Sequence, residues 1–350
     1  MRSLLYIFNG RFPTEKAHGI QIAKMCEAYT RAGMQVTLMV PWQRNLLDLG
    51  MYGLKQPFSI KRVWALDPAW LWNMSQRTGT FVRTISGMLG IVFSLAEADV
   101  VYTRDYTTLI LLALFGRNPV VEIHDYRLSH RSVLLAWALK KARAIICNSE
   151  GTKSLLTTHY PPRRLRVGAP TEASGLSSIL VVPNGVDVDF FDIPETREEA
   201  RKKLKLPQDK IIIGYVGSME VAGREKGVAT LRGAFDCMKS REKAELTLVI
   251  SVPYTQVPLY LRAIDIAVIP YPGDQHARTT SPMKLFEYQA ARKTIVVADS
   301  PDPQRLAEKL DEAIMHPHPY DGELYTWEAR ASRIMQEVGY TVPEEVEIED

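Results

Sequence analysis

A serine, a proline and a lysine in the second half of the chain are spaced as a phosphate site requires. Ser281 is a favoured N-cap, and Pro282 suits the first position of a helix. The backbone amides of Met283 and Lys284 are then expected to point out of the helix end, which attracts anions. Lys284 adds a full positive charge. The segment therefore predicts a site for a diphosphate.

A glutamate on the same helical face extends this candidate site. Glu287 follows Lys284 by three residues, about 4.5 Å along the helix axis, and can accept hydrogen bonds from the hydroxyls of a sugar or ribose. Thr279 and Thr280, just before the helix, complete the candidate site. An ordinary capped helix with a Lys–Glu pair at the surface is the alternative, and this segment alone does not separate the two.

The length and composition favour two globular domains. The chain has 350 residues, 46% of them hydrophobic, so each half can bury a core. Cys26, Cys147 and Cys237 lack the spacing of a metal site, and their odd number favours reduced, packed thiols. The apolar stretch 84–96 is too short to span a bilayer, and the first residues do not form a signal peptide. We expect a cytoplasmic protein, either soluble or peripheral on the inner face of the membrane.

Charge divides the chain into a basic half and an acidic half. Residues 1–180 contain 22 Lys and Arg against 11 Asp and Glu, a net charge of +11, whereas residues 181–350 contain 21 against 29, a net charge of −8. The basic residues are dispersed and show no aromatic–basic repeat, which favours an anionic membrane surface or an anionic acceptor over a nucleic acid. A merely solvated surface is the remaining alternative.

Hydrophobic periodicity predicts two domains in tandem, each with a parallel sheet. An apolar strand at 4–8 is followed by a helix with apolar residues at helical spacing and by a strand at 36–40, which together form a β-α-β unit. Further strands of the first half are expected at 100–103, 120–123 and 144–147, with helices at 107–115 and 132–141. The second half repeats the scheme with strands at 211–216, 246–250, 266–269 and 295–297.

The predicted fold class is therefore α/β, with two doubly wound domains. We place the first domain at 1–180, the second at 181–330, and a helix end with an acidic tail at 331–350. In open α/β sheets ligands bind at the carboxyl ends of strands, so the site is expected in a cleft that the two domains face. Gly10 follows the first strand, where a side chain would crowd a phosphate or sugar.

Several segments, in order along the chain, resemble the retaining glycosyltransferases of family 4, which have the GT-B fold of two Rossmann-like domains. They are 13–21 (PTEKAHGIQ), 122–125 (EIHD), 145–149 (IICNS), 182–187 (VPNGVD), 215–218 (YVGS) with 225–227 (EKG), 263–270 (AIDIAVIP) and 281–291 (SPMKLFEYQAA). Each segment is a weak signal alone, but the ordered set covers nearly the whole chain.

The resemblance implies a metal-independent, hexosyltransferase-type enzyme without a cofactor. It would move a sugar from a nucleotide-diphosphate sugar to an acceptor hydroxyl and retain the anomeric configuration. The first domain would face a carbohydrate or lipid-linked acceptor, and the second would bind the nucleotide sugar. The usual role of family members and the basic first half of the chain favour a function in cell-envelope polysaccharide or glycolipid synthesis.

The resemblance also implies roles for single residues. Lys226 matches the lysine that holds the donor diphosphate, and Glu287 matches the second glutamate of the family's Glu-x7-Glu motif, expected on the donor ribose. His124 matches a histidine near the reacting sugar. We expect these three to be catalytic, and Lys16 and His18 to contact the acceptor. The alternative explanations are that Lys226 is an exposed lysine at the start of a helix and that His124 has a structural role.

Two departures from the family pattern fall in the second domain. Thr279 replaces the first glutamate of that motif, and Ser218 replaces the arginine of a common Gly-Arg pair. A related branch with Ser-Pro-x-Lys-x-Phe-Glu fits better, and there Lys284 would supply the charge of the missing arginine. We therefore include Ser218 among the expected donor contacts.

The resemblance runs short near 251–253 and 300–303, where family members have further strand and helix segments. Either the second domain is trimmed or residues are absent from the sequence. We expect the second, because a strand that ends at Ile250 leaves no room for a crossover helix. A measured intact mass of 39.6 kDa would exclude absent residues. The segment 325–330 resembles the family's final helix, which returns to the first domain, with Trp327 in the core.

Other functions are also compatible with the motifs. A nucleotide-sugar epimerase on the same fold and a non-catalytic nucleotide-sugar-binding family member both fit the motifs. A nicotinamide-dependent oxidoreductase is disfavoured, because no Gly-x-Gly-x-x-Gly follows either first strand. Trp64, Trp70, Trp72 and residues 81–93 form either a membrane-touching or acceptor-binding surface or, as the commoner explanation, a buried helix.

Overall fold

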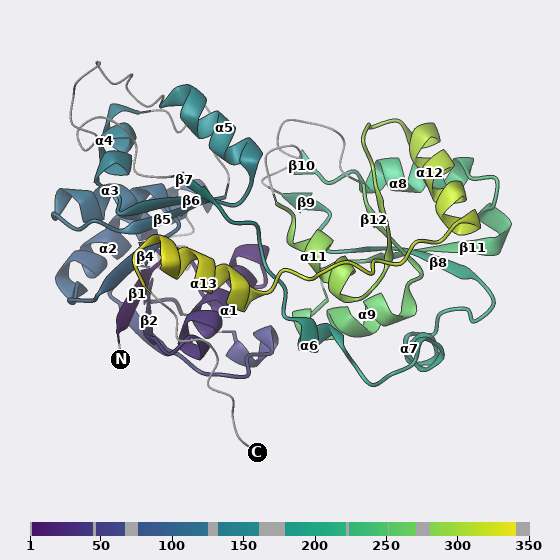
Figure 1. Cartoon of the computed structure of the whole chain (residues 1–350), viewed down its shortest axis with the longest axis horizontal. Helices are drawn as coiled ribbons and strands as arrows, with labels where there is room; N and C mark the ends of the chain where they lie inside the picture. Colours follow the sequence, from purple (N-terminus) through teal and green to yellow (C-terminus); the bar gives the residue numbers. More distant parts are fainter. Residues whose placement is uncertain are drawn as a thin grey trace. The chain divides into compact units, whose positions relative to one another are not determined.

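The computed structural model describes residues 2–44, 47–66, 76–124, 132–160, 179–221, 224–250, 252–270 and 281–340 (Figure 1). The chain divides into two compact units. Unit 1 comprises Met1–Pro183 and Trp327–Asp350, and unit 2 comprises Asn184–Thr326. Each unit contains a parallel sheet covered by helices, which is the predicted α/β class.

Unit 1 contains a sheet of seven parallel strands in the spatial order β3-β2-β1-β4-β5-β6-β7. The strands are β1 (Ser3–Ile7), β2 (Gln35–Pro41), β3 (Ser59–Val63), β4 (Val100–Thr103), β5 (Val120–Ile123), β6 (Ala144–Cys147) and β7 (Ile179–Val181). The chain runs outward from β1 to β3 and then returns to place β4 on the other side of β1. Ligands bind at such a reversal of strand order, so the loops after β1 and β4 form the candidate edge of unit 1.

The helices of unit 1 include one from the far end of the chain. They are α1 (Ala17–Arg31), α2 (Gln76–Ser94), α3 (Tyr106–Leu114), α4 (Val133–Lys141), α5 (Glu150–His159) and α13 (Trp327–Glu337), with a short 3-10 turn, η1 (Leu49–Tyr52). Helix α13 packs on α1, and Trp327 is buried. The predicted return of the final helix to the first domain is confirmed. The structure divides the chain at Pro183 and Thr326, whereas the sequence placed the limits at 180 and 330.

Unit 2 contains a four-stranded parallel sheet in the order β11-β8-β12-β13. The strands are β8 (Ile211–Val216), β11 (Ala244–Val249), β12 (Ile266–Ile269) and β13 (Thr294–Val297), and an antiparallel pair is formed by β9 (Glu220–Val221) and β10 (Arg224–Glu225). The helices are α6 (Val188–Phe191), α7 (Arg197–Leu204), α8 (Val228–Cys237), α9 (Val257–Ala263), α11 (Met283–Ala290) and α12 (Pro303–Met315), with 3-10 turns η4 (Arg241–Lys243) and η5 (Tyr254–Gln256). The strand order reverses between β8 and β12, as it does at β1 in unit 1.

The connection from β11 to β12 corrects one expectation from the sequence. It passes through η5 and α9, and it crosses from one side of β8 to the other. The prediction that no crossover helix fits after Ile250 is therefore wrong. A helix of only seven residues suffices, because β11 and β12 are separated by the single strand β8.

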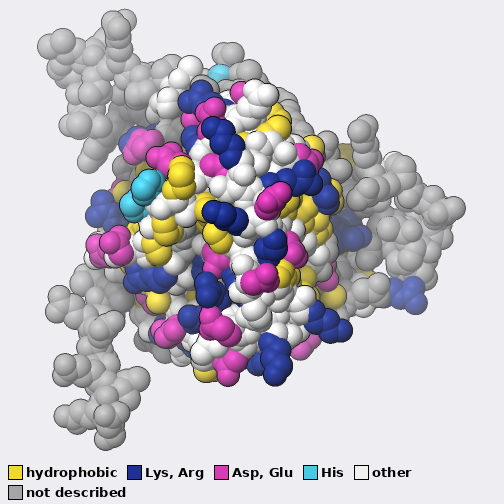
Figure 2. Space-filling view, turned by 90° about the vertical axis from the view of Figure 1, so that its right-hand side faces the viewer, with side chains coloured by type: hydrophobic (Ala, Val, Ile, Leu, Met, Phe, Trp, Pro, Cys, Tyr) yellow, Lys and Arg dark blue, Asp and Glu magenta, His cyan; other side chains and the backbone are white. Residues whose placement is uncertain are grey.

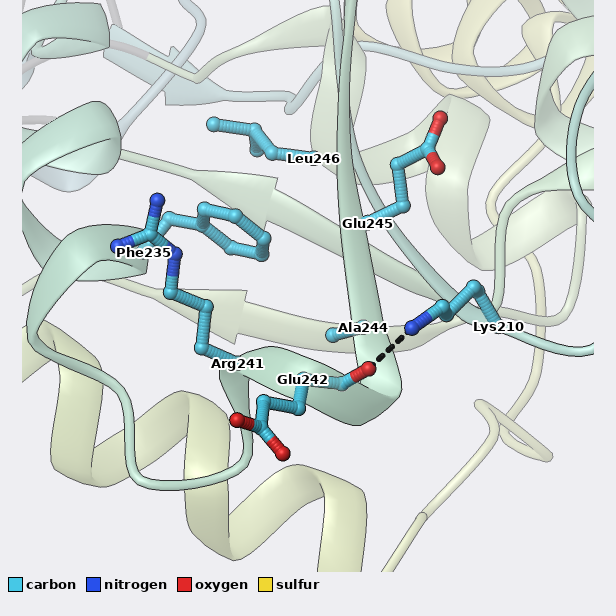
Figure 3. A pocket seen from close by; sticks show the side chains of 7 residues that line it. All are labelled: Lys210, Phe235, Arg241, Glu242, Ala244, Glu245 and Leu246. Atoms are coloured by element: carbon cyan, nitrogen blue, oxygen red, sulfur yellow. Dashed lines mark hydrogen bonds between the residues drawn. The ribbon is translucent and has the colours of Figure 1, made fainter.

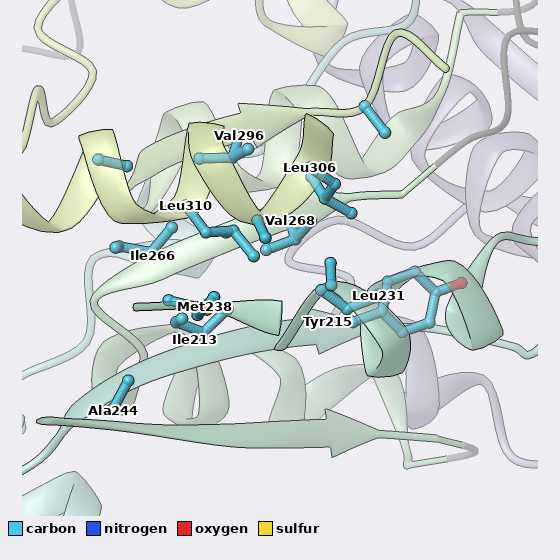
Figure 4. Packing of buried hydrophobic residues seen from close by; sticks show 14 of the residues in the cluster. Ile213, Tyr215, Leu231, Met238, Ala244, Ile266, Val268, Val296, Leu306 and Leu310 are labelled. Atoms are coloured by element: carbon cyan, nitrogen blue, oxygen red, sulfur yellow. The ribbon is translucent and has the colours of Figure 1, made fainter. Parts of the chain in front are cut away.

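The core of unit 2 lies between its sheet and the helices α8 and α12 (Figure 4). Strands β8, β12 and β13 supply Ile213, Val268 and Val296, and the helices supply Leu231 and Leu310. The face of the molecule on the right of Figure 1, where α12 and β11 lie, shows Lys and Arg interspersed with Asp and Glu (Figure 2). The charges visible on this face do not separate into a patch of one sign.

The cysteines follow the prediction in two of three cases. Cys26 and Cys147 are buried free thiols. Cys237 is exposed, so the expectation of a packed thiol is wrong there. Helix α8 buries Leu231 and Ala234, and Cys237 ends the helix outside that face.

Candidate functional site

Lys284 is the central residue of the candidate site in unit 2. It lies in the first turn of α11, and its ammonium nitrogen Nζ is 3.7 Å from the centre of the Tyr215 ring on β8. Nζ is buried and has no hydrogen-bond partner among the residues that the structure describes. Burial and the charge of Lys226 lower the pKa of Lys284 well below its usual value, against an opposite effect of Glu287. Burial of an ammonium is costly where it is not paired.

A glycine makes room for this ammonium. Gly217 follows β8, and a Cβ built on it would lie 2.3 Å from Lys284 Nζ. The φ angle of Gly217 is +141°, a conformation that other residues rarely adopt. A side chain at this position would therefore displace the Lys284 ammonium, and the backbone at the end of β8 favours glycine.

A second lysine lies beside the first. Lys226, which follows β10, donates a hydrogen bond of 2.8 Å from Nζ to Ser218 Oγ, and burial lowers its pKa. Its positive charge acts on Lys284 closely enough to lower the pKa of that residue. The structure thus brings together Ser218, Lys226 and Lys284, which the sequence had proposed from three separate segments.

Glu287 is buried one turn further along α11. Burial raises the pKa of Glu287 to about 7, while the charge of Lys284 and a hydrogen bond from the Tyr254 hydroxyl oppose this rise. Lys284 Nζ does not donate a hydrogen bond to Glu287, although both groups lie on the first turns of one helix. The alternative of a Lys–Glu pair at the surface is wrong, because both charged groups are buried.

The start of α11 differs from the expected cap. Pro282 is the N-cap residue, and no side chain caps the helix, which begins at Met283. Ser281 instead binds Asn184: its Oγ accepts from the Asn184 amide at 3.4 Å, and its carbonyl accepts from Asn184 Nδ2 at 2.6 Å. The prediction of Ser281 as N-cap and Pro282 as first helical residue is therefore wrong by one position. The amides of Met283 and Lys284 still lie in the first turn, where helices leave amides without internal partners.

His124 in unit 1 is held by a buried carboxylate. It follows β5, and its Nε2 lies against the carboxylate oxygen Oε1 of Glu122. Its Nδ1 is 3.4 Å from Asn148 Nδ2. Burial and the charge of Arg104 lower the pKa of His124 to about 4 against the effect of Glu122, so the imidazole is neutral at neutral pH. A neutral imidazole can donate a hydrogen bond to a hydroxyl group or accept one from it.

Glu122 is the centre of a buried polar network. Its carboxylate accepts hydrogen bonds from Tyr102 at 2.6 Å, from Gln21 at 2.9 Å and from Arg330 at 2.5 Å. Arg330 comes from α13 and also donates to the carbonyl of Pro183 at 2.8 Å. The charge of Arg330 holds the pKa of Glu122 well below its usual value despite complete burial. The final helix therefore fixes the carboxylate beneath His124.

The other predicted residues of unit 1 surround the loop after β1. A Cβ on Gly10 would lie 2.3 Å from the Phe8 ring, and the His18 ring is 5.5 Å from that same ring between centres. Burial lowers the pKa of His18 to about 3. Lys16 is exposed at the N-cap of α1. Gly10 thus adjoins Phe8 and His18, whereas Lys16 faces solvent.

Five residues considered from the sequence lie outside the described residues, namely Trp70, Trp72, Asp125, Thr279 and Thr280. Within the described parts, no group of three or more His, Cys, Asp or Glu side chains is placed to hold a metal ion. In the same parts, none of the helices is both long and apolar enough to cross a membrane.

A depression in unit 2 lies at the opposite edge of the sheet (Figure 3). It is lined by residues around the start of β11, namely Lys210, Phe235, Arg241, Glu242, Ala244, Glu245 and Leu246. Lys210 Nζ donates a hydrogen bond to the Glu242 carbonyl there (Figure 3). Parallel α/β sheets bind ligands at the carboxyl ends of their strands, so this depression at the amino ends is not the candidate site.

Sequence reasoning did not find Tyr215, Tyr254, Glu122 or Arg330 as members of these clusters. Tyr215 and Glu122 lie within recognised strands, where an alternating or apolar pattern gives no sign of a polar role. Tyr254 contacts Glu287 and Arg330 contacts Glu122, each from a different element of the structure. The spacing of these residues in the sequence gives no sign of either contact.

Comparison with known proteins supports one family. Residues 19–169 match the family model Glycosyltransferase Family 4. A Bacillus subtilis protein assigned to teichuronic acid biosynthesis as a glycosyltransferase, TuaH, is 24% identical over 166 residues, which cover 42% of this chain and 41% of TuaH. A second such protein, TuaC, is 30% identical over 135 residues, or 34% of this chain and 33% of TuaC. The chain thus spans about two fifths or less of the length of these relatives.

Solved structures match over nearly the whole chain. Sucrose-phosphate synthase from Thermosynechococcus elongatus has a TM-score of 0.68 at 14% identity, with 96% of this chain and 98% of that chain covered. HepE from Anabaena, solved with UDP-glucose, has a TM-score of 0.61 at 13% identity, with 98% and 96% covered. WaaG, a glycosyltransferase of lipopolysaccharide biosynthesis, has a TM-score of 0.56 at 14% identity, with 98% and 96% covered. These comparisons agree with the resemblance found in the sequence: part of unit 1 matches the glycosyltransferase family 4 model, and the solved structures show the GT-B fold over both units.

Proposed function

We propose that this protein is a retaining glycosyltransferase that moves a sugar from a nucleotide-diphosphate sugar to an acceptor hydroxyl without a metal ion. The acceptor would be a carbohydrate or a lipid-linked saccharide, and the process would be polysaccharide or glycolipid synthesis at the inner face of the membrane. Support for the donor comes from HepE, whose structures contain UDP and glucose. Support for the process comes from the assignments of TuaH, TuaC and WaaG.

The observation that carries the proposal is the environment of Lys284. Its buried ammonium has no hydrogen-bond partner in the described residues, lies over the Tyr215 ring and adjoins Lys226. The buried Lys284 and the half-buried Lys226 repel each other, and a diphosphate would relieve this repulsion. The amides in the first turn of α11 add to the attraction for the same anion.

The chemistry follows from where negative charge develops. As the bond between the sugar and the diphosphate breaks, the leaving group gains charge, and Lys226 and Lys284 can stabilise it. We propose for Glu287 the ribose hydroxyls, and for His124 a hydrogen bond to a hydroxyl of the transferred sugar. Ser218 would contact the diphosphate together with Lys226, which it already binds. We assign no protein nucleophile.

Binding of nucleotide sugars tests the proposal directly. We expect UDP-glucose or a related nucleotide sugar to raise the melting temperature, because it binds the folded state alone. Lys284→Met should weaken donor binding by about tenfold or more, as expected for a lost charge-assisted contact. Lys202→Met, which removes an exposed lysine of α7, is the matched control and should bind as the wild type does. Equal affinity of all three proteins would refute the role of Lys284.

Product analysis separates transfer from the alternatives. A transferase releases nucleoside diphosphate only as the sugar appears on an acceptor, whereas an epimerase converts the donor without a second substrate. Donor binding with no turnover on any acceptor tried would favour a non-catalytic binding protein. Turnover that persists in the presence of a metal chelator is expected, and its complete loss would contradict the metal-independent reaction.

A further inference from the structure

Helix α2 carries its large apolar side chains on the outside of unit 1. Phe81, Ile85, Leu89 and Phe93 recur every fourth residue and therefore share one face of the helix. Their exposed fractions range from 46% to 87%. A helix on the surface of a protein ordinarily turns such a stripe toward the core. In α2 the stripe faces solvent instead.

The face of α2 that meets the sheet combines small residues with Ile91, which is completely buried in the core of unit 1. Ser86 and Gly87 are buried, and Ser86 Oγ accepts a hydrogen bond of 2.9 Å from the Leu66 amide. A Cβ on Gly90 would lie 2.0 Å from the carbonyl oxygen of Trp64, and one on Gly87 would lie 2.4 Å from Asn9 Oδ1. The backbone of α2 therefore approaches its neighbours closely at Gly87 and Gly90, and Ile91 already fills the core side of the helix, so the apolar stripe stays on the outside.

An exposed tryptophan lies beside α2. Trp64 is 59% exposed, and its carbonyl oxygen lies against Gly90 of α2. We define the α2 patch as Trp64, Phe81, Ile85, Leu89 and Phe93. Single exposed apolar residues are common on proteins, but contiguous ones mark contact surfaces. Tryptophan and phenylalanine side chains are typical of helices that lie in the headgroup region of a membrane.

The charges near the α2 patch favour an anionic partner. The sequence of α2 contains no acidic residue, and Arg83 adds a positive charge to the helix. Lys61 donates a hydrogen bond of 2.8 Å from Nζ to the carbonyl of Ser94, the last residue of α2. The first acidic residue after the helix is Glu97. A second copy of this chain would present the same positive charges, so self-association through the patch would bring like charges together.

We infer that the α2 patch docks on a membrane surface that contains anionic lipids. The apolar side chains would enter the headgroup region, and Lys61 and Arg83 would meet the lipid phosphates. This assigns a specific surface to the membrane association in the proposed function, and it is tested without any measurement of sugar transfer.

Vesicle co-sedimentation of the full chain tests the inference. We expect binding to vesicles of phosphatidylglycerol and phosphatidylcholine, weaker binding to phosphatidylcholine alone, and partial loss at high salt. The variant Phe81→Ser/Phe93→Ser should bind at least about tenfold more weakly, because it removes two apolar anchors. The control Val133→Ser/Leu134→Ser removes two exposed apolar side chains of α4 and should bind as the wild type does.

Several outcomes would overturn the inference. These are no vesicle binding by the wild type, or equal binding by the wild type and the α2 variant. Dimers of the wild type that the α2 variant abolishes, without vesicle binding, would assign the patch to a second copy. Melting curves of both double variants check their folding, and the substituted side chains are exposed. Calorimetry with UDP-glucose on the same samples separates the two proposals: vesicle binding without donor binding contradicts the proposed function alone, and the reverse contradicts this inference alone.

Discussion

The guanidinium of Arg330 lies 2.5 Å from the carboxylate of Glu122, and both side chains are completely buried. Arg330 is in α13, near the end of the chain, whereas Glu122 is in β5, the strand that His124 follows. The pair therefore ties the end of the chain to the strand that positions the candidate histidine.

We predict that Arg330→Met destabilises the protein by about 3–5 kcal/mol, because it leaves the buried Glu122 carboxylate without its counter-charge. The double variant Arg330→Met/Glu122→Gln should be more stable than the sum of the two single changes implies. Urea unfolding followed by circular dichroism measures both. A cost of Arg330→Met below about 1 kcal/mol would show that the pair is not structural.

Lys284→Met is predicted to leave the free protein equally stable or more stable while it weakens donor binding. The buried ammonium has no hydrogen-bond partner in the described residues, so its removal relieves a desolvation cost. Differential scanning fluorimetry with and without UDP-glucose separates the two effects. A variant that loses stability without ligand would indicate a structural lysine.

Gly217→Ala is predicted to lower donor affinity by about tenfold, because the added methyl group would displace the Lys284 ammonium. Its stability should also fall by about 1–3 kcal/mol through backbone strain at positive φ. Gly33→Ala is the control, since Gly33 also has positive φ but open space around its Cβ position. That control should lose stability alone, and a similar loss of donor affinity in both variants would reject the steric explanation.

Donor binding is predicted to take up protons at alkaline pH. Burial and Lys226 lower the pKa of Lys284 in the free protein, and a bound diphosphate would raise it again. Between these two values the complex holds a proton that the free protein lacks. At a pH of about 8.5 Glu287 is already ionised, since its pKa is about 7, and it contributes little. Calorimetry of UDP binding in buffers of different ionisation enthalpy measures the uptake, which Lys284→Met should abolish.

His124 is predicted to stay neutral until the pH falls to about 4. Because its pKa in the unfolded chain is higher, this residue contributes stability above the unfolded value and loses it as the pH falls toward 4. Glu122→Gln should lower the pKa of His124 further, since the carboxylate favours the charged imidazole. Imidazole NMR shifts followed from neutral to acid pH report this directly. A pKa near the ordinary value in the wild type would contradict the buried environment.

The sequence predicted those strands best whose apolar runs are continuous. The expected bounds of β4, β5, β6, β8 and β12 agree with the structure, because a strand buried on both faces has an unbroken apolar pattern. Strand β3 was missed, since this edge strand contains Lys61 and Arg62 and resembles a loop. Helix α2 was expected to be buried more often than exposed, but Ile91 and the close contacts of Gly87 and Gly90 occupy its inner side, and its apolar stripe is exposed.

By itself the sequence determined the two α/β units, the family resemblance and the position of Lys226, Lys284 and Glu287 in the segments that approach one another in unit 2. Only the tertiary structure decided how these residues are placed. Ser281 binds Asn184, 97 residues away, instead of capping its own helix. Lys284 lies on Tyr215 in the space left by Gly217, and Glu122 finds its counter-charge in Arg330, 208 residues further on. The local pattern of apolar residues predicts which side of a helix or strand is buried. The partners of buried polar groups come from other segments, which meet only when the chain has folded.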